Sequence, residues 1–292
     1  MRRSWVVGAV SVLLLCLATP GMVWAGDDES NEDLPRLVHE SNLQIRATPI
    51  GLSHASDTGY RFPLFDSDSD LLDGTHIDAG VATNLSPSYG WIGPYVELLP
   101  VAVLNLRASF QAMGYFGTFG YLYLPGDDPE GSDGDWSDEA LDRAWDDGLG
   151  ESAGGWKLEL QATPQIMVGP VVATVETDFS HINMGVDDAY YEPFYDLFFE
   201  PTDQLVVTRP TVGYLMDMEE GHLLIGARWE RAWVRQAEIV RDTAGLVFNW
   251  GVPSSLLAWG DPSVAGFGGV FLDHPTRGGV SPYFGMSVNV GF

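Results

Sequence analysis

The stretch "VSPYFGMSVNVGF", residues 280–292, alternates strictly between apolar side chains and small or polar ones over its second half. A period of two is the pattern of a β-strand, because successive side chains of a strand point to opposite faces. One face of this strand would be continuously apolar, and it would include the aromatic residue at position 292. We assign Phe284, Met286, Val288, Val290 and Phe292 to the apolar face, and Tyr283, Ser287 and Asn289 to the opposite face.

The same period recurs through residues 38–292, whereas the helical period of 3.6 is nearly absent. In "WKLELQAT", residues 156–163, Leu158 and Leu160 alternate with Lys157 and Glu159. The run "VVATVETDF", residues 171–179, follows after a short segment that contains Pro and Gly, so the two runs are typical of a hairpin. The sequence therefore predicts an all-β fold made of antiparallel hairpins.

Counted in this way, the chain has ten predicted strands, and tight turns alternate with long acidic or Gly-rich connections. Short turns at one end and long loops at the other are typical of an outer-membrane barrel. Twelve strands are the alternative, if residues 75–84 and 119–124 each form a further strand. The ten strands are predicted at residues 39–51, 91–99, 101–116, 156–166, 170–180, 204–216, 221–234, 245–252, 263–272 and 280–292. The long connections are predicted at residues 52–90, 125–155, 181–203, 235–245 and 272–280.

A soluble β-sandwich or a soluble barrel would show a similar alternation, with the apolar faces turned inward. The polar faces favour the membrane barrel, because they carry charges of both signs at mid-strand positions rather than a water-facing mixture. Aromatic residues near the predicted strand ends also fit the interfacial girdles of such a barrel. We therefore predict a transmembrane antiparallel up-and-down β-barrel over residues 38–292, with long acidic extracellular loops.

The first 25 residues have the pattern of a cleaved secretory signal peptide, with Arg2 and Arg3 before an apolar core and "VWA" at its end. Residues 26–37 are then predicted to form an acidic, disordered periplasmic stub. The only cysteine, Cys16, lies within the signal. A formal net charge of −27 argues against a nucleic-acid partner, which would require basic patches. The sequence predicts export to the cell outer membrane.

Charged residues on the polar faces form a candidate network inside the barrel, five of each sign. A barrel of about ten strands is little wider than one that side chains fill, so opposed charges should pair there. We predict a charge-lined lumen that is narrow or plugged, and a polar conduit for small solutes is the alternative. The predicted lumen residues are Arg46, Glu97, Arg107, Lys157, Glu159, Glu176, Asp178, Arg209, Arg228 and Glu230.

A weak calcium site is the one cofactor site that the sequence suggests. In "DSDSDLLDG", residues 66–74, Asp66, Asp68, Asp70 and Asp73 stand at spacings similar to those of a calcium loop, whose oxygen ligands alternate. Leu71 occupies the position of the sharp-turn glycine, however, and no glutamate stands at the twelfth position. A solvated acidic loop is the simpler interpretation.

Asp178 and His181, with Ser180 beside them, are weak candidates for a hydrolytic site at the barrel mouth. A ten-stranded barrel of this length is similar in size to the omptin proteases, and some lipid hydrolases also carry such groups on barrels. Residues three apart on a strand point to opposite faces, however. A barrel-borne protease or lipid-modifying hydrolase is therefore the alternative function.

Residues 280–292 resemble the last strand of Gram-negative outer-membrane proteins, with the apolar and polar faces given above and a terminal aromatic residue. The resemblance implies that the barrel-assembly machinery engages this strand and Phe292, and that outer-membrane lipids and lipopolysaccharide surround the barrel. It indicates no subfamily and no substrate. We predict a structural or surface-interaction protein, or one that passes small polar solutes or cations.

Overall fold

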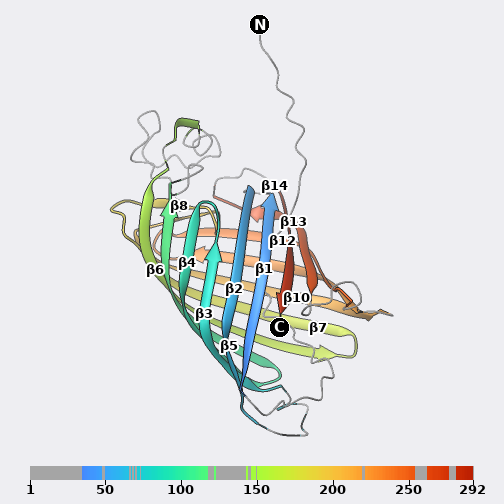
Figure 1. Ribbon diagram of the computed structural model, residues 1–292. Helices are drawn as coiled ribbons and strands as arrows, with labels where there is room; N and C mark the ends of the chain where they lie inside the picture. Colours follow the sequence, from blue (N-terminus) through green and yellow to red (C-terminus); the bar gives the residue numbers. More distant parts are fainter. Residues whose placement is uncertain are drawn as a thin grey trace.

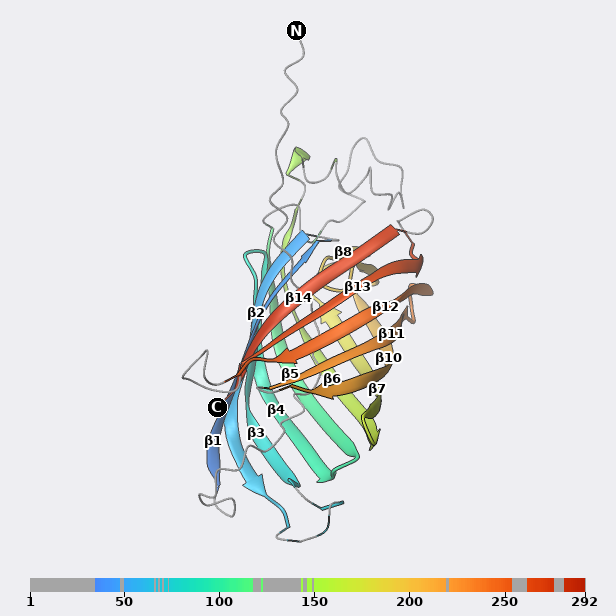
Figure 2. The same cartoon turned by 90° about the vertical axis from the view of Figure 1, so that its right-hand side faces the viewer.

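A closed antiparallel barrel dominates the computed structural model of the chain, which describes residues 35–47, 50–65, 67, 69, 71–72, 74–117, 122, 143, 146–148, 150–218, 221–253, 262–275 and 281–291. Twelve strands form the barrel, and two short strands form a separate hairpin. β1 (Arg36–Ala47) closes the barrel against β14 (Ser281–Gly291), with Leu43 opposite Val288. Figures 1 and 2 show β1 between β2 and β14, and the strands at the front cross those behind, as strand tilt requires.

The other barrel strands follow one another around the wall in sequence order. They are β2 (Ile50–Pro63), β3 (His76–Leu85), β4 (Tyr89–Val101), β5 (Leu104–Phe116), β6 (Ser152–Val168), β7 (Val171–Met184), β10 (Thr202–Asp217), β11 (His222–Val234), β12 (Ile239–Gly251) and β13 (Ser263–Asp273). The separate hairpin consists of β8 (Tyr190–Glu192) and β9 (Leu197–Phe199), in the connection between β7 and β10.

The two faces of the wall differ in the way that a membrane requires. Leu160 and Val212 point outward and are 47% and 56% exposed, whereas Thr163 and Ser287 point inward and are 2% and 0% exposed. Apolar side chains outside and polar ones inside are the arrangement of a transmembrane barrel. The predicted all-β transmembrane barrel is confirmed. No helix in the described ranges is both long and apolar enough to cross a membrane.

The barrel has twelve strands, which was the alternative prediction. The preferred prediction of ten strands was two too few. The strand predicted at residues 75–84 is β3. The second additional strand is β2, in a segment that was predicted to be part of a long loop. Its outward face carries His54, Ser56 and Thr58, so the segment shows no apolar alternation. Of the other predicted strand, residues 119–124, only Leu122 is described.

Some boundaries also differ from the predictions. β1 ends at Ala47 instead of residue 51, because the chain turns back there to pair Ala47 with Ile50. β12 begins at Ile239, within a predicted loop. β1 includes residues 36–37 of the predicted stub, whereas the predicted signal peptide, residues 1–25, lies outside the described residues.

Two directly opposed glycines allow the wall to approach Tyr95 closely. Gly59 of β2 pairs with Gly80 of β3, and both lie on the inward face. A Cβ atom on Gly59 would lie 2.9 Å from the hydroxyl oxygen of Tyr95, and one on Gly80 would lie 2.1 Å from the carbonyl oxygen of Thr58. Glycine is therefore required at these positions, where the backbone comes close to its neighbours.

Candidate functional site

The connection between β7 and β10 folds into the barrel. Residues 185–201, here called the plug, contain the β8–β9 hairpin, in which Tyr190 lies opposite Phe199. Tyr190, Leu197 and Phe199 are fully buried. Loops between strands are ordinarily exposed to solvent. These residues are buried because the inward side chains of the barrel strands surround the hairpin.

An apolar core forms around the plug at this end of the lumen. Burying a large apolar side chain stabilises a structure by about 1.5–3 kcal/mol, so several together hold the hairpin firmly. The inward side chains that share one buried cluster with the plug are Tyr89 and Trp91 of β4, Met113 and Tyr115 of β5, Ile182 and Met184 of β7, Leu205 and Val207 of β10, and Ala232 and Val234 of β11.

The turn of the plug packs against Trp91. The ring of Phe194 lies 4.7 Å from the ring of Trp91, edge to face, and Tyr195 stacks on the same indole at 6.2 Å. Lys157 of β6 lies beneath them, with its ammonium 4.6 Å from the Trp91 ring and 3.2 Å from the Tyr195 hydroxyl. Through its contact with Tyr195, Lys157 links the plug to the charged residues further along the lumen.

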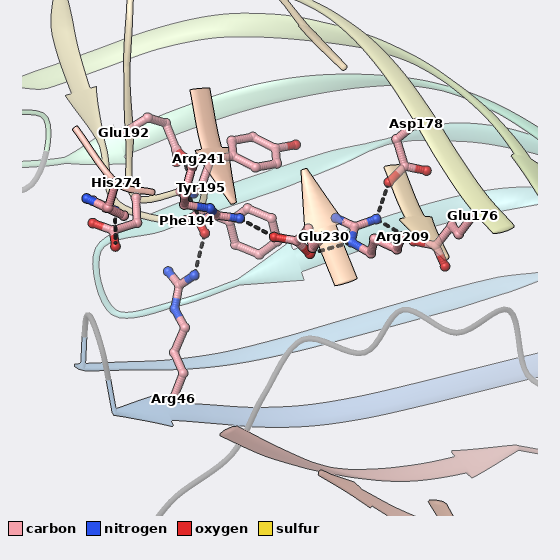
Figure 3. Close-up of polar contacts among 11 residues, drawn as sticks. Arg46, Glu176, Asp178, Glu192, Phe194, Tyr195, Arg209, Glu230, Arg241 and His274 are labelled. Carbon is pink, nitrogen blue, oxygen red and sulfur yellow. Dashed lines mark hydrogen bonds and ion pairs between the residues drawn. The ribbon is translucent and has the colours of Figure 1, made fainter. Parts of the chain in front are cut away.

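Two arginines from opposite ends of the sequence hold the backbone of the turn (Figure 3). Arg46 of β1 donates from its two terminal nitrogens to the carbonyl oxygens of Pro193 and Phe194. Arg241 of β12 donates to the carbonyl oxygen of Tyr195. A charged donor strengthens each of these hydrogen bonds, and each contributes about 1.5–3 kcal/mol.

Glu192 is fully buried within the plug. The Tyr115 hydroxyl donates to one of its carboxyl oxygens, and the backbone N–H of Tyr195 donates to the other at 2.6 Å. Burial raises the pKa of the Glu192 carboxyl above its ordinary value of 4.5, although these hydrogen bonds act in the opposite direction. The plug thus contains a carboxyl group that holds its proton more strongly than a free glutamate does.

A buried hydrogen bond links the plug to the connection after β13. Nε2 of His274 lies 3.0 Å from a carboxyl oxygen of Asp196, and these side chains are 0% and 1% exposed. The Tyr191 hydroxyl donates to the other oxygen of the same carboxylate. Asp196 has a φ of 54°, in the left-handed region that aspartate tolerates better than most residues.

Asp203, at the start of β10, fixes the base of the plug. One of its carboxyl oxygens accepts from the backbone N–H groups of Gln204 and Gln236, at 2.7 and 2.9 Å. The other accepts from the N–H groups of Glu200 and Ala237, at 3.1 and 3.2 Å. This buried carboxylate ties the end of the plug to the turn between β11 and β12.

Charged side chains line the lumen beyond the plug, and we call this group of paired charges the belt. On β5, Arg107 lies eight residues before the plug contact Tyr115, roughly 26 Å along the strand. Arg107 pairs with Asp57 at 2.8 Å and with Glu97 at 3.2 Å, and Arg61 pairs with Asp78 at 2.7 Å. The belt is partly hydrated, since the side chain of Asp57 remains 27% exposed.

Arg209 is the centre of the belt on the opposite wall (Figure 3). Its guanidinium pairs with Glu176 and Asp178 of β7 and, at 2.7 Å, with Glu230 of β11. Glu230 also accepts from Arg241, which in turn holds the plug. A continuous polar chain therefore runs from the turn of the plug to the middle of the lumen.

The structure brings most of the predicted lumen residues together in pairs. Besides the Arg107 and Arg209 groups, Lys157 lies 2.8 Å from Glu159. Arg46 donates hydrogen bonds to the backbone of the plug. Arg228 hydrogen-bonds to Thr211 at 3.0 Å and forms no ion pair with a carboxylate of the described residues.

The weak catalytic candidates do not meet. Asp178 points into the lumen toward Arg209, whereas His181 lies outside beside the Trp156 ring, at 5.3 Å. The calcium candidates Asp66, Asp68, Asp70 and Asp73, and the assembly residue Phe292, lie outside the described residues. Within the described ranges, no three His, Cys, Asp or Glu side chains are grouped so that they could hold a metal ion.

Sequence reasoning missed several charged residues of the lumen, and it did not identify the segment that forms the plug. Asp57 and Arg61 belong to the unrecognised strand β2, Asp78 to β3, and Arg241 to a segment predicted to be a loop. The aromatic density of "YYEPFYDLFF", residues 190–199, was the available signal, because six aromatic side chains in ten residues seldom remain in water.

Comparisons with known proteins give no family. No family model matches the chain, and no curated protein matches its sequence. The β-domain of the Bordetella autotransporter BrkA is 9% identical, covers 88% of this chain and 96% of its own, and has a TM-score of 0.47. The translocator domain of the autotransporter NalP from Neisseria meningitidis is 13% identical, covers 88% of both chains, and has a TM-score of 0.40.

The in-vitro-folded OmpT of Vibrio cholerae, in its trimer form, is 8% identical, covers 89% of this chain and 99% of its own, and has a TM-score of 0.36. The assignment to a class of protein comes from the fold itself. A closed antiparallel barrel of twelve strands, apolar outside and polar inside, is an outer-membrane β-barrel of the Gram-negative type.

Proposed function

We propose that this chain is an outer-membrane barrel that the plug closes in its resting state, and that it acts as a structural or surface-interaction protein. The complete burial of the plug supports this proposal above all. Apolar packing and hydrogen bonds from β1, β5 and β12 hold the plug in the lumen. A barrel closed in this way presents its loops at the surface and passes little through its centre.

Gated passage of small polar solutes or cations is the second candidate. The accessibility of the belt to water favours gated passage, because the side chains of Asp57 and Glu159 remain 27% and 24% exposed. Movement of the plug would join this polar space to the exterior. A hydrolase has no comparable support, since Asp178 and His181 lie on opposite faces of β7.

Single-channel recording in planar bilayers tests the closed state. Replacing residues 187–199 with Gly-Ser-Gly should leave the wall intact, because the backbone N–H of Met184 already donates to the carbonyl oxygen of Pro201 at 2.9 Å. We expect the unmodified protein to be silent and the shortened protein to conduct steadily. Equal conductance of the two proteins would contradict closure by the plug.

Point variants separate the plug contacts from general damage to the barrel. The double variant Arg46→Ala, Arg241→Ala removes three hydrogen bonds to the turn and should produce brief openings. Arg231→Ala is the matched control, because this arginine pairs with Asp242 at 2.6 Å and remains 52% exposed on the outer face. Openings of the control at the same frequency would argue against a specific latch.

A further inference from the structure

Six polar side chains interrupt the outer surface of β1, β2 and β3, which elsewhere carries apolar residues. They occupy the outward positions of these strands, since Gln44, Asp57 and Asp78 mark the inward positions. We call these residues the polar stripe: His39 and Ser41 of β1, His54, Ser56 and Thr58 of β2, and Thr83 of β3.

The residues of the polar stripe are joined in three hydrogen-bonded pairs across the strands. Nδ1 of His39 lies 2.7 Å from the Thr58 hydroxyl, and Nε2 of His54 lies 2.8 Å from the Ser41 hydroxyl. The hydroxyls of Ser56 and Thr83 are 2.8 Å apart. The Thr83 hydroxyl also donates to the carbonyl oxygen of Ser56 at 3.4 Å. A hydroxyl oxygen has two acceptor sites, so hydroxyl groups of this kind can accept from a donor on another surface.

The centre of the stripe lies midway along its strands, the part of a transmembrane barrel that faces the hydrocarbon core. Ser41 is at the middle of β1 and lies directly opposite Ser56, near the middle of β2. Most outward residues along the other strands are apolar, including Val96, Leu160, Val175, Val212, Ile225 and Val288. Thr177 of β7 and Thr208 of β10, which lie opposite each other, are an outward polar pair, but the six residues of the polar stripe form the larger group. Lipid chains offer no hydrogen bonds, so a polar surface at this depth is stabilised when another protein surface covers it.

A second copy of this chain fits the stripe best. Two barrels in one membrane, related by a twofold axis along the membrane normal, place identical residues at identical depth. The stripe would then face its own donors and acceptors, and imidazole and hydroxyl groups can act as both. Exposed apolar side chains border it on both ends and would form the rim of the interface: Leu43 and Leu52 at one end, Leu37, Tyr60 and Phe62 at the other.

We propose that the outward face of β1–β3 is the contact between two copies of this chain in the membrane. The proposal is independent of the plug, which lies inside the barrel. Thiol cross-linking in native outer membranes tests it, with Ser41→Cys, Ser56→Cys and Thr83→Cys made separately in a Cys16→Ser background. Val175→Cys and Val212→Cys are the controls, because β7 and β10 lie across the barrel from β1.

With a short bis-maleimide, we expect the stripe variants to give about tenfold more covalent dimer than the controls. Equal yields from the two sets, or no dimer from any stripe variant, would overturn the proposal. A stripe variant that cross-links only to another membrane protein would also overturn it.

A second measurement uses light scattering of the purified protein in detergent. The triple variant His54→Leu, Ser56→Val, Thr58→Val should change the mass from that of a dimer to that of a monomer, with heat-modifiable migration reporting an intact barrel. His181→Leu is the matched control, because it removes an outward histidine on β7 and should leave the dimer. A monomeric unmodified protein, or a dimeric triple variant, would contradict the proposal.

Discussion

At the plug end of the lumen Tyr190, Leu197 and Phe199 are fully buried, whereas in the belt Asp57 and Glu159 keep about a quarter of their side chains exposed. The same twelve strands enclose both regions. The apolar core of the plug excludes water, and the paired charges of the belt line a space that water still reaches. In the proposed closed state, the packing of the plug would therefore close the lumen, because the charge pairs of the belt leave a space that water can enter.

The largest effect is expected from a cavity in the plug. Phe199→Ala removes a fully buried ring, and truncations of this kind cost about 3–5 kcal/mol. We expect the plug to leave the lumen for a measurable fraction of time, and chymotrypsin added to intact cells should then cleave within residues 190–199. Phe110→Ala, on the outer face of β5, is the control and should leave the plug protected. Full protection of the Phe199 variant would show that apolar packing does not hold the plug.

An intermediate effect is expected from pH. Because burial raises the pKa of Glu192 in the docked plug, docking is most stable below the ordinary carboxyl pKa of 4.5. Its stability falls as the pH rises through the higher pKa of the docked state. We expect cleavage by chymotrypsin, corrected for the pH dependence of the protease, to increase over this range.

Glu192→Gln should abolish this trend, because glutamine does not titrate. A pH profile that is unchanged in the Glu192 variant would assign the dependence to another group.

The smallest effect is expected in the belt. Asp57→Asn removes one of the two carboxylates that pair with Arg107, while Glu97 remains at 3.2 Å. Because this pair is partly hydrated, we expect a loss of about 1 kcal/mol or less in the free energy of unfolding. Urea titration of the barrel in detergent measures it, and protection of the plug should not change. A loss as large as that of the Phe199 variant would remove the distinction between the two regions.

The sequence predicted those strands in which most outward residues are apolar and most inward residues are polar or charged. In β6, Leu158 and Leu160 face outward while Lys157 and Glu159 face inward, so alternation alone locates the strand. β2 lacked this signal, because the polar stripe occupies its outward face. The residues that made the prediction fail are therefore those that indicate a contact surface.

The plug was predictable only in part. The sequence indicated a narrow or plugged lumen and a long connection over residues 181–203, but loops that fold inward follow no periodic pattern. The docking of Tyr195 on Trp91, and the reach of Arg46 to the carbonyl of Phe194, depend on residues far apart in the chain. Only the closed barrel brings these residues together.

That closure also sets an order of events during biogenesis. The partners of the plug include Arg46 on the first strand, and Arg241 and His274 near the last ones. Its binding site is therefore complete only when β1 has paired with β14. Until then the turn of the plug lacks its hydrogen bonds from Arg46, so we expect the plug to gain its last contacts only when the barrel has closed.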